Sequence, residues 1–173
     1  DDIEVLKEQK DRLFIMELCL HCADVSNSYK TMNICAKWAE VVVKEFCAQG
    51  DREKLEGLEV SPMMDRATVN VNNMQLGFIE FVVSPLITSF VNIFYPLNDI
   101  CQNLIINYCE WAKKRRDEIF SDNNIQDKEE ECRKLEERVK KFRDKFNWLE
   151  EIRSWPVRNH RKSTKLPTKL QSK

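Results

Sequence analysis

Three side chains have types and spacing that could form a ligand pocket. Asp24 ends an apolar helical pattern and directly precedes a polar turn with Ser26 and Asn27. A carboxylate there can bind zinc or magnesium, although an Asp before Ser and Asn more often hydrogen-bonds the helix end. Gln75 lies in an apolar stretch with Phe78 one turn later, so both project to one helix face. A buried amide needs hydrogen-bond partners, which either the neighbouring backbone or a ligand can supply.

The composition favours an all-α fold. Of 173 residues only 3 are Gly and 5 are Pro, so few turns and long helices are expected. The length suits one domain, and the apolar fraction of 42% is adequate for a core. The net charge of −1 gives no reason to expect nucleic-acid binding. No uninterrupted apolar run reaches membrane-spanning length, no secretory signal opens the chain, and the 7 cysteines indicate buried thiols in an intracellular, cytoplasmic protein.

Helical periodicity of apolar residues predicts the main elements. The expected helices span residues 3–24, 32–48, 74–90, 98–119 and 127–150. Gly50 is expected to end the second helix in a left-handed conformation, with a charged loop or short helix after it. Asn72 or Asn73 is expected to cap the third helix. Pro85 should kink that helix or split it at Ser84.

The last of these segments carries a heptad seam. Its apolar residues are spaced alternately three and four apart, and they are Cys132, Leu135, Val139, Phe142, Phe146 and Leu149. The seam is short for a coiled coil, so a helix that packs on its own domain is the favoured interpretation. Self-association through residues 132–149 is the alternative. The basic tail from Pro156 is expected to be disordered.

Four segments together resemble the class I 3′,5′-cyclic nucleotide phosphodiesterases. They are residues 20–27 (Leu-His-Cys-Ala-Asp-Val-Ser-Asn), 49–53 (Gln-Gly-Asp-Arg-Glu), 61–66 (Ser-Pro-Met-Met-Asp-Arg) and 74–79 (Met-Gln-Leu-Gly-Phe-Ile). The resemblance covers only the C-terminal half of that catalytic domain. It implies a multi-helix, mostly antiparallel all-α fold. Residues 1–120 would form this half-domain, 121–155 a charged amphipathic helical extension and 156–173 the tail.

The resemblance also implies site residues. Asp24 takes the place of the last of four ligands to a catalytic zinc, in a centre that also holds magnesium. Gln75 would form paired hydrogen bonds to a purine edge, and Phe78 would stack on the ring. The same alignment with the family places Val42 on the other face of the purine ring from Phe78. It also assigns Asn27 and Met63 to the lining of the base pocket. The implied substrate is cAMP or cGMP. The sequence of residues 51–66 most resembles the cGMP-preferring branch of the family.

The sequence departs from the family pattern near this site. Ser28 and Thr31 stand where the family has prolines, so a looser turn is expected. Cys19 and Cys22 form a Cys-x-x-Cys pair within a helix, and no second pair follows. Buried thiols are therefore favoured there over a zinc or redox site, and His21 between them is expected to be structural.

The residues that complete the family's chemistry are not found in this sequence. In the resembling enzymes two metals hold a hydroxide that attacks phosphorus, and a His protonates the leaving 3′ oxygen. The other zinc ligands come from H-N-x-x-H and H-D motifs, whereas this chain has only His21 and His160. We therefore expect a fragment, inactive alone, that contributes a purine pocket and one metal ligand. The alternative is a non-catalytic helical interaction or dimerisation module derived from a phosphodiesterase.

Overall fold

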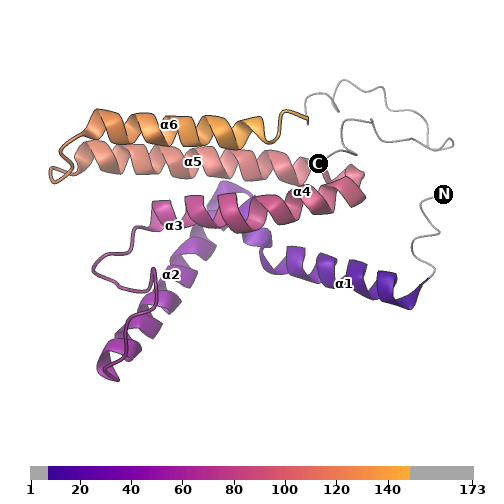
Figure 1. Ribbon diagram of the computed structural model, residues 1–173, viewed down its shortest axis with the longest axis horizontal. Helices are drawn as coiled ribbons and strands as arrows, with labels where there is room; N and C mark the ends of the chain where they lie inside the picture. Colours follow the sequence, from indigo (N-terminus) through magenta and orange to yellow (C-terminus); the bar gives the residue numbers. More distant parts are fainter. Residues whose placement is uncertain (1–7, 149–173) are drawn as a thin grey trace.

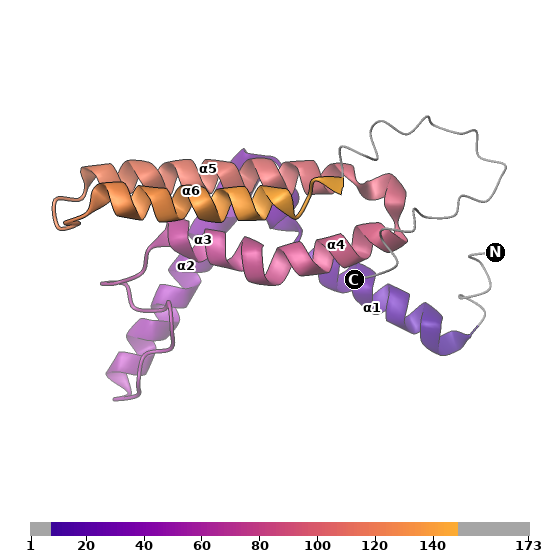
Figure 2. The same ribbon diagram turned by 45° about the horizontal axis from the view of Figure 1, so that its top comes forward.

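The computed structural model describes residues 8–148, which form helices joined by loops, with no strand in this range. In chain order the elements are α1 (Gln9–Asp24), the 3-10 turn η2 (Ser26–Tyr29), α2 (Met32–Leu55), α3 (Val71–Phe78), the π-helix η3 (Ile79–Val83), α4 (Ser84–Ile93), the 3-10 turn η4 (Tyr95–Leu97), α5 (Asp99–Ser121) and α6 (Lys128–Asp144). α3, η3 and α4 form one continuous rod beside α5, and α1 and α2 diverge from it (Figures 1 and 2). The predicted all-α fold is confirmed. The predicted basic tail lies outside the described residues.

The core lies where the rod packs on α5. Buried side chains recur along the rod at intervals of three or four residues, namely Leu76, Ile79, Val83, Ile87 and Val91. The buried side chains of α5 include Cys101, Leu104, Tyr108, Ala112 and Ile119. Burial of each large aliphatic side chain stabilises the fold by about 1.5–3 kcal/mol relative to exposure. This interface fixes the rod, which carries the two central residues of the predicted pocket.

The heptad seam of α6 packs within the chain. Its residues Cys132, Leu135, Phe142 and Phe146 belong to the buried core, and Val139 packs against that core. The rings of Phe142 and Tyr108 of α5 stack with their centroids 3.8 Å apart. This agrees with the interpretation that the helix packs on its own domain. Leu149 lies outside the described residues, and the division at residue 120 stays a prediction.

Gly50 does not end a helix, contrary to the prediction. α2 continues to Leu55, and the left-handed glycine is Gly57, with φ of 70°. A Cβ on Gly50 would lie 2.1 Å from the carbonyl oxygen of Met64. The glycine is therefore needed because the loop backbone approaches α2 closely, not because the chain reverses there.

Gly50→Ala is expected to destabilise the fold despite the higher helix propensity of alanine. The added methyl group would displace the Met64 backbone, and overpacking of this kind costs about 1–3 kcal/mol. Gly77→Ala is the matched control, since a Cβ there meets nothing within 4 Å and should add up to about 1 kcal/mol of stability. Denaturant unfolding measures both. Equal stabilities of the two variants would contradict the steric explanation.

The cap of α3 also differs from the prediction. Asn70, rather than Asn72 or Asn73, caps the helix, because its Oδ1 accepts a hydrogen bond from the backbone N–H of Asn73 at 2.8 Å. Asn72 is buried and donates to Glu118 of α5 at 2.5 Å. Three nearby Asn residues have the same capping preference, so the sequence alone does not identify the capping residue.

The break predicted at Ser84 takes the form of a change in helix type. The π-helix η3 ends at Val83, and α4 begins at Ser84 with Pro85 in its first turn. The proline lies where the helix changes from π to α, so the missing N–H coincides with a change in the backbone hydrogen-bonding pattern. The chain direction therefore continues through the proline.

Among residues 8–148, one helix, residues 71–93, is long and apolar enough to cross a membrane by length and composition, with a mean hydropathy of 1.7 over its best window. This measure averages over polar residues such as Glu80, whereas the sequence expectation concerned uninterrupted apolar runs, and Glu80 does interrupt this one. Part of this helix packs on α5, and Phe81 and Val82 line the cavity described below. Packing and the cavity thus account for part of its apolar composition.

Candidate functional site

A cavity of about 540 Å³ lies between α2 and the rod, with contributions from the end of α1, η2 and the loop before α3. It is lined by all six residues that the sequence predicted for the site, namely Asp24, Asn27, Val42, Met63, Gln75 and Phe78. The sequence reasoning missed mainly apolar lining residues, which include Ala39, Phe46, Met74, Phe81 and Val82. A mainly apolar cavity of this size with a few polar groups is typical of small-molecule sites.

Gln75 gives this cavity an unsatisfied hydrogen-bonding group. Its side chain is 4% exposed, and its Oε1 atom has no hydrogen-bond partner. A buried amide oxygen left unpaired costs about 1–3 kcal/mol. The competing interpretation, in which neighbouring backbone satisfies this oxygen, does not match the structure. Because Gln75 and Phe78 line the same cavity, the site offers a polar acceptor beside an aromatic ring, which suits a planar ligand with a polar edge.

Met63 lines the cavity from a strained backbone position. Its φ of 64° is left-handed, which is unusual for a residue with a side chain. Such a conformation persists only where the surroundings impose it, and it occurs often at ligand sites. The close approach of the next residue, Met64, to Gly50 is one such constraint.

Polar contacts hold the Met63 loop on α2. They are the ion pairs Arg66–Asp51 and Lys54–Asp65, each at 2.7 Å, and the bond from the Ser61 backbone N–H to Glu53 at 2.7 Å. Hydrogen bonds from Gln49 and Ser61 lower the pKa of Glu53, so it is a charged acceptor at neutral pH. Residues 49–53 and 61–66, which carried part of the family resemblance, thus fix this loop.

The turn after Asp24 is held by α5. Asn107 Nδ2 donates to the carbonyl oxygens of Ser28 and Lys30, each at 2.8 Å. The Tyr29 hydroxyl donates to the carbonyl of Cys22, and burial raises the pKa of Tyr29 to about 12, so it remains a donor. The looser turn expected from the loss of two prolines is therefore not observed. Instead, long-range hydrogen bonds position this segment.

Asp24 is the only one of the six predicted residues with a carboxylate. It is the exposed last residue of α1. Within residues 8–148, no three His, Cys, Asp or Glu side chains are placed to hold a metal ion together. The described residues therefore provide no complete metal site.

The Cys-x-x-Cys pair does not behave as a unit. Cys22 is buried, and burial raises the pKa of its thiol, whereas Cys19 is exposed. The expectation of buried thiols is thus correct for Cys22 and wrong for Cys19. Their differing environments give no support to a shared metal site.

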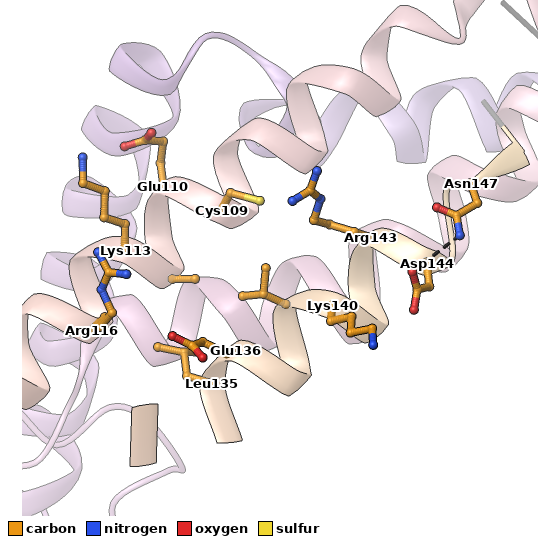
Figure 3. A pocket seen from close by; sticks show the side chains of 12 residues that line it. Cys109, Glu110, Lys113, Arg116, Leu135, Glu136, Lys140, Arg143, Asp144 and Asn147 are labelled. Carbon is orange, nitrogen blue, oxygen red and sulfur yellow. Dashed lines mark hydrogen bonds between the residues drawn. The ribbon is translucent and has the colours of Figure 1, made fainter. Parts of the chain in front are cut away.

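A second cavity, of about 660 Å³, lies between α5 and α6 (Figure 3). Charged residues of both signs line it, namely Glu110, Lys113, Arg116, Glu136, Lys140, Arg143 and Asp144. None of the buried side-chain atoms that lack a partner in the described part of the chain belongs to a residue lining it. The first cavity is therefore the candidate functional site.

The described residues thus form an all-helical fold with a mainly apolar cavity that Gln75 and Phe78 line. The family model for 3′5′-cyclic nucleotide phosphodiesterase matches residues 2–104, more than half of the 173 residues. The chain belongs to this family. The match includes the four segments that carried the resemblance and ends within α5, so α6 lies beyond it.

Individual relatives agree with this assignment. The chain is 33% identical over 111 residues to 3′,5′-cyclic-AMP phosphodiesterase 4C of Rattus norvegicus, covering 64% of this chain and 21% of the rat protein. It is 32% identical to 3′,5′-cyclic-AMP phosphodiesterase 4C of Mus musculus over 64% of this chain and 16% of the mouse protein. A solved structure of LmjPDEB1 in complex with IBMX is similar with a TM-score of 0.59 and 32% identity, over 61% of this chain and 32% of that one. The chain thus matches only about a fifth of the length of these curated relatives.

Proposed function

We propose that the complete protein hydrolyses 3′,5′-cyclic nucleotides to 5′-nucleoside monophosphates, and that this chain contributes the purine pocket and one metal ligand. The observation that carries the proposal is the unpartnered Oε1 atom of Gln75 in a cavity shared with Phe78. The relatives named above are 3′,5′-cyclic-AMP phosphodiesterases, which favours cAMP. The sequence of residues 51–66 instead favours cGMP, and the amide of Gln75 can rotate to pair with either purine.

The proposed pocket gives each part of a purine a suitable partner. The amide of Gln75 pairs with the polar edge of the base, where it can both donate and accept. Phe78 stacks on one face of the ring, and Val42 of α2 covers the other. Asn27 and Met63 complete the lining. The unpaired oxygen of Gln75 gains its hydrogen bond only when the base is bound, which favours a ligand with a donor on its edge.

Asp24 is the residue proposed to bind a divalent metal, with zinc and magnesium as the ions of the complete domain. A catalytic zinc site needs about three protein ligands, and Asp24 is one. The remaining ligands and the general acid would be supplied by other parts of the complete protein. No catalytic step is assigned to the residues described here, whose proposed work is to bind and orient the base.

Gln75→Ala and Phe78→Ala in the complete enzyme are expected to raise KM more than they lower kcat. Loss of the amide should weaken binding by about 1 kcal/mol, and more where a group is left unpaired. Loss of stacking should cost about 1–3 kcal/mol. Steady-state kinetics with cAMP and cGMP measures this, and metal content should stay unchanged. Phe120→Ala, at an exposed position outside the cavity, is the control. An unchanged KM in both pocket variants would refute the purine site.

The alternative function, a non-catalytic interaction module, draws support from the surface of α1. The predicted apolar face of this helix is open to solvent, with Leu13 at 50%, Met16 at 66% and Leu20 at 66% exposure. Exposed faces of this kind mark interaction sites or drive association. In the enzyme proposal, the same face is covered by the rest of the catalytic domain.

The chain alone is therefore expected to associate or to unfold without a sharp transition. Light scattering combined with thermal unfolding measures both properties. Replacing Met16 and Leu20 by Lys should reduce association, because it adds charge to the exposed apolar face. Glu17→Lys, which changes the charge at another exposed position of the same helix, is the control. A sharp, cooperative transition from a monomer would contradict this prediction and would favour the interaction module.

A further inference from the structure

The π-helix η3 forms a wall of the candidate cavity and carries the only charged side chain of residues 71–93. Phe81 and Val82 line the cavity, and Glu80 immediately precedes them. Glu80 Oε2 accepts a hydrogen bond from the hydroxyl of Tyr108 of α5 at 3.1 Å and another from Nε of Arg138 of α6 at 2.6 Å. Two helices therefore hold the residue next to the cavity wall.

This anchor is largely shielded from water. The side chains of Glu80 and Arg138 are 14% and 30% exposed, and a charged pair at this separation forms a strong hydrogen bond. Tyr108 is buried and stacks on Phe142 of α6. Burial raises the pKa of Tyr108, so its hydroxyl remains a donor. Packing and charge thus fix the position of Glu80 together.

Because η3 is a π-helix, the position of Glu80 affects how the neighbouring residues face the cavity. A π-turn accommodates one more residue than an α-turn, and such turns occur often at functional sites. The start of the rod is tied separately to α5 by bonds from Asn70 and Asn72 to Glu118. If η3 relaxed to an α-helical register, Phe81 and Val82 would rotate relative to Phe78. A fixed Glu80 opposes that rotation.

We propose that Arg138 is a positioning residue for the nucleotide pocket, acting through Glu80 on the η3 wall. Its effect on nucleotide binding rests on the function proposed above. Arg138 lies beyond residue 104, where the family match ends. The helix that follows the matched region therefore helps to shape a pocket whose lining residues all lie within that region.

The first test needs no nucleotide. Arg138→Met removes the charge while keeping most of the side-chain length, and Arg138→Lys keeps the charge. Arg133→Met is the matched control, because Arg133 is on the same helix and pairs with Glu130 but is 68% exposed. Hydrogen exchange of the backbone amides of residues 79–83 is measured in the full chain. Residues 79–83 are expected to exchange faster in Arg138→Met. In Arg138→Lys and Arg133→Met their exchange should stay near that of the original protein.

The second test measures binding of a fluorescent cAMP analogue to the same variants. Arg138→Met should weaken binding by roughly 2- to 30-fold, the range for coupling through packed networks. Arg138→Lys should restore part of the affinity, and Arg133→Met should leave it unchanged. In the complete enzyme the same change should raise KM and leave kcat near its original value.

The outcomes separate this inference from the proposed function. Suppose that the analogue binds, that Phe78→Ala weakens this binding and that Arg138→Met does not. The positioning role of Arg138 is then wrong, and the proposed pocket is retained. If the analogue binds and Phe78→Ala has no effect, the proposed function and the binding consequence both fail. If the analogue does not bind this chain, the KM values of the same variants in the complete enzyme decide the binding consequence. Unchanged exchange of residues 79–83 in Arg138→Met overturns the inference whatever the nucleotide result.

Discussion

The 173-residue chain, purified alone, is expected to hydrolyse neither cAMP nor cGMP. It contains only two histidines, His21 and His160, and no three possible ligands come together within residues 8–148. Without about three protein ligands a catalytic zinc is not held, so no attacking water would be activated. The expected result is a rate at the background of the assay. Enzymes typically exceed the uncatalysed rate by about 10⁶-fold or more, so the difference is large.

The measurement is product formation in the presence of added zinc and magnesium, followed by chromatography of the nucleotides. A protein containing the complete catalytic domain is the positive control, and a mock purification is the negative control. Turnover that a chelator abolishes and that the mock lacks would show that these residues are sufficient for catalysis. The proposal that other parts of the complete protein supply the remaining metal ligands and the general acid would then be wrong.

The pocket could be anticipated from the sequence because its central features are local. Gln75 and Phe78 share a helix face by their spacing alone, and the polar turn after Asp24 marks a helix end. The grouping of Val42 and Met63 with them depended on the family resemblance, since they lie on separate segments. The unpartnered Oε1 of Gln75 is a property of three-dimensional packing, and no local pattern encodes it.

Two features that the sequence analysis did not capture depend on contacts between residues far apart in the chain. Gly50 followed by charged residues has the local features of a helix end, but its role is set by Met64, 14 residues later, whose backbone would meet a Cβ. The contact between Glu80 and Arg138 joins residues 58 positions apart. In the sequence, Glu80 only interrupts an apolar run. Its partner on α6 becomes evident only when α6 is placed against α5.

Asp24→Ala in the complete enzyme is expected to abolish activity through loss of metal. In the proposed metal site, this carboxylate would be one of few ligands and one of the negative charges that offset the metal charge. Changes in residues that only orient metal ligands already cost about 10–100-fold, so removal of a ligand should lower the rate by more than about 100-fold. Metal analysis of the purified protein, together with steady-state kinetics, tests the assignment.

The control for this change is Glu17→Ala, which removes another exposed acid from the same helix outside the cavity. It should retain metal and activity. The metal-free forms of Asp24→Ala and the original protein should unfold at the same temperature, because the exposed Asp24 makes no hydrogen bond or ion pair needed for folding among the contacts described here. Full zinc occupancy with a normal rate in Asp24→Ala would remove Asp24 from the metal site. Loss of activity with full occupancy would assign it a role in binding the substrate, because Asp24 lines the same cavity as Gln75 and Phe78.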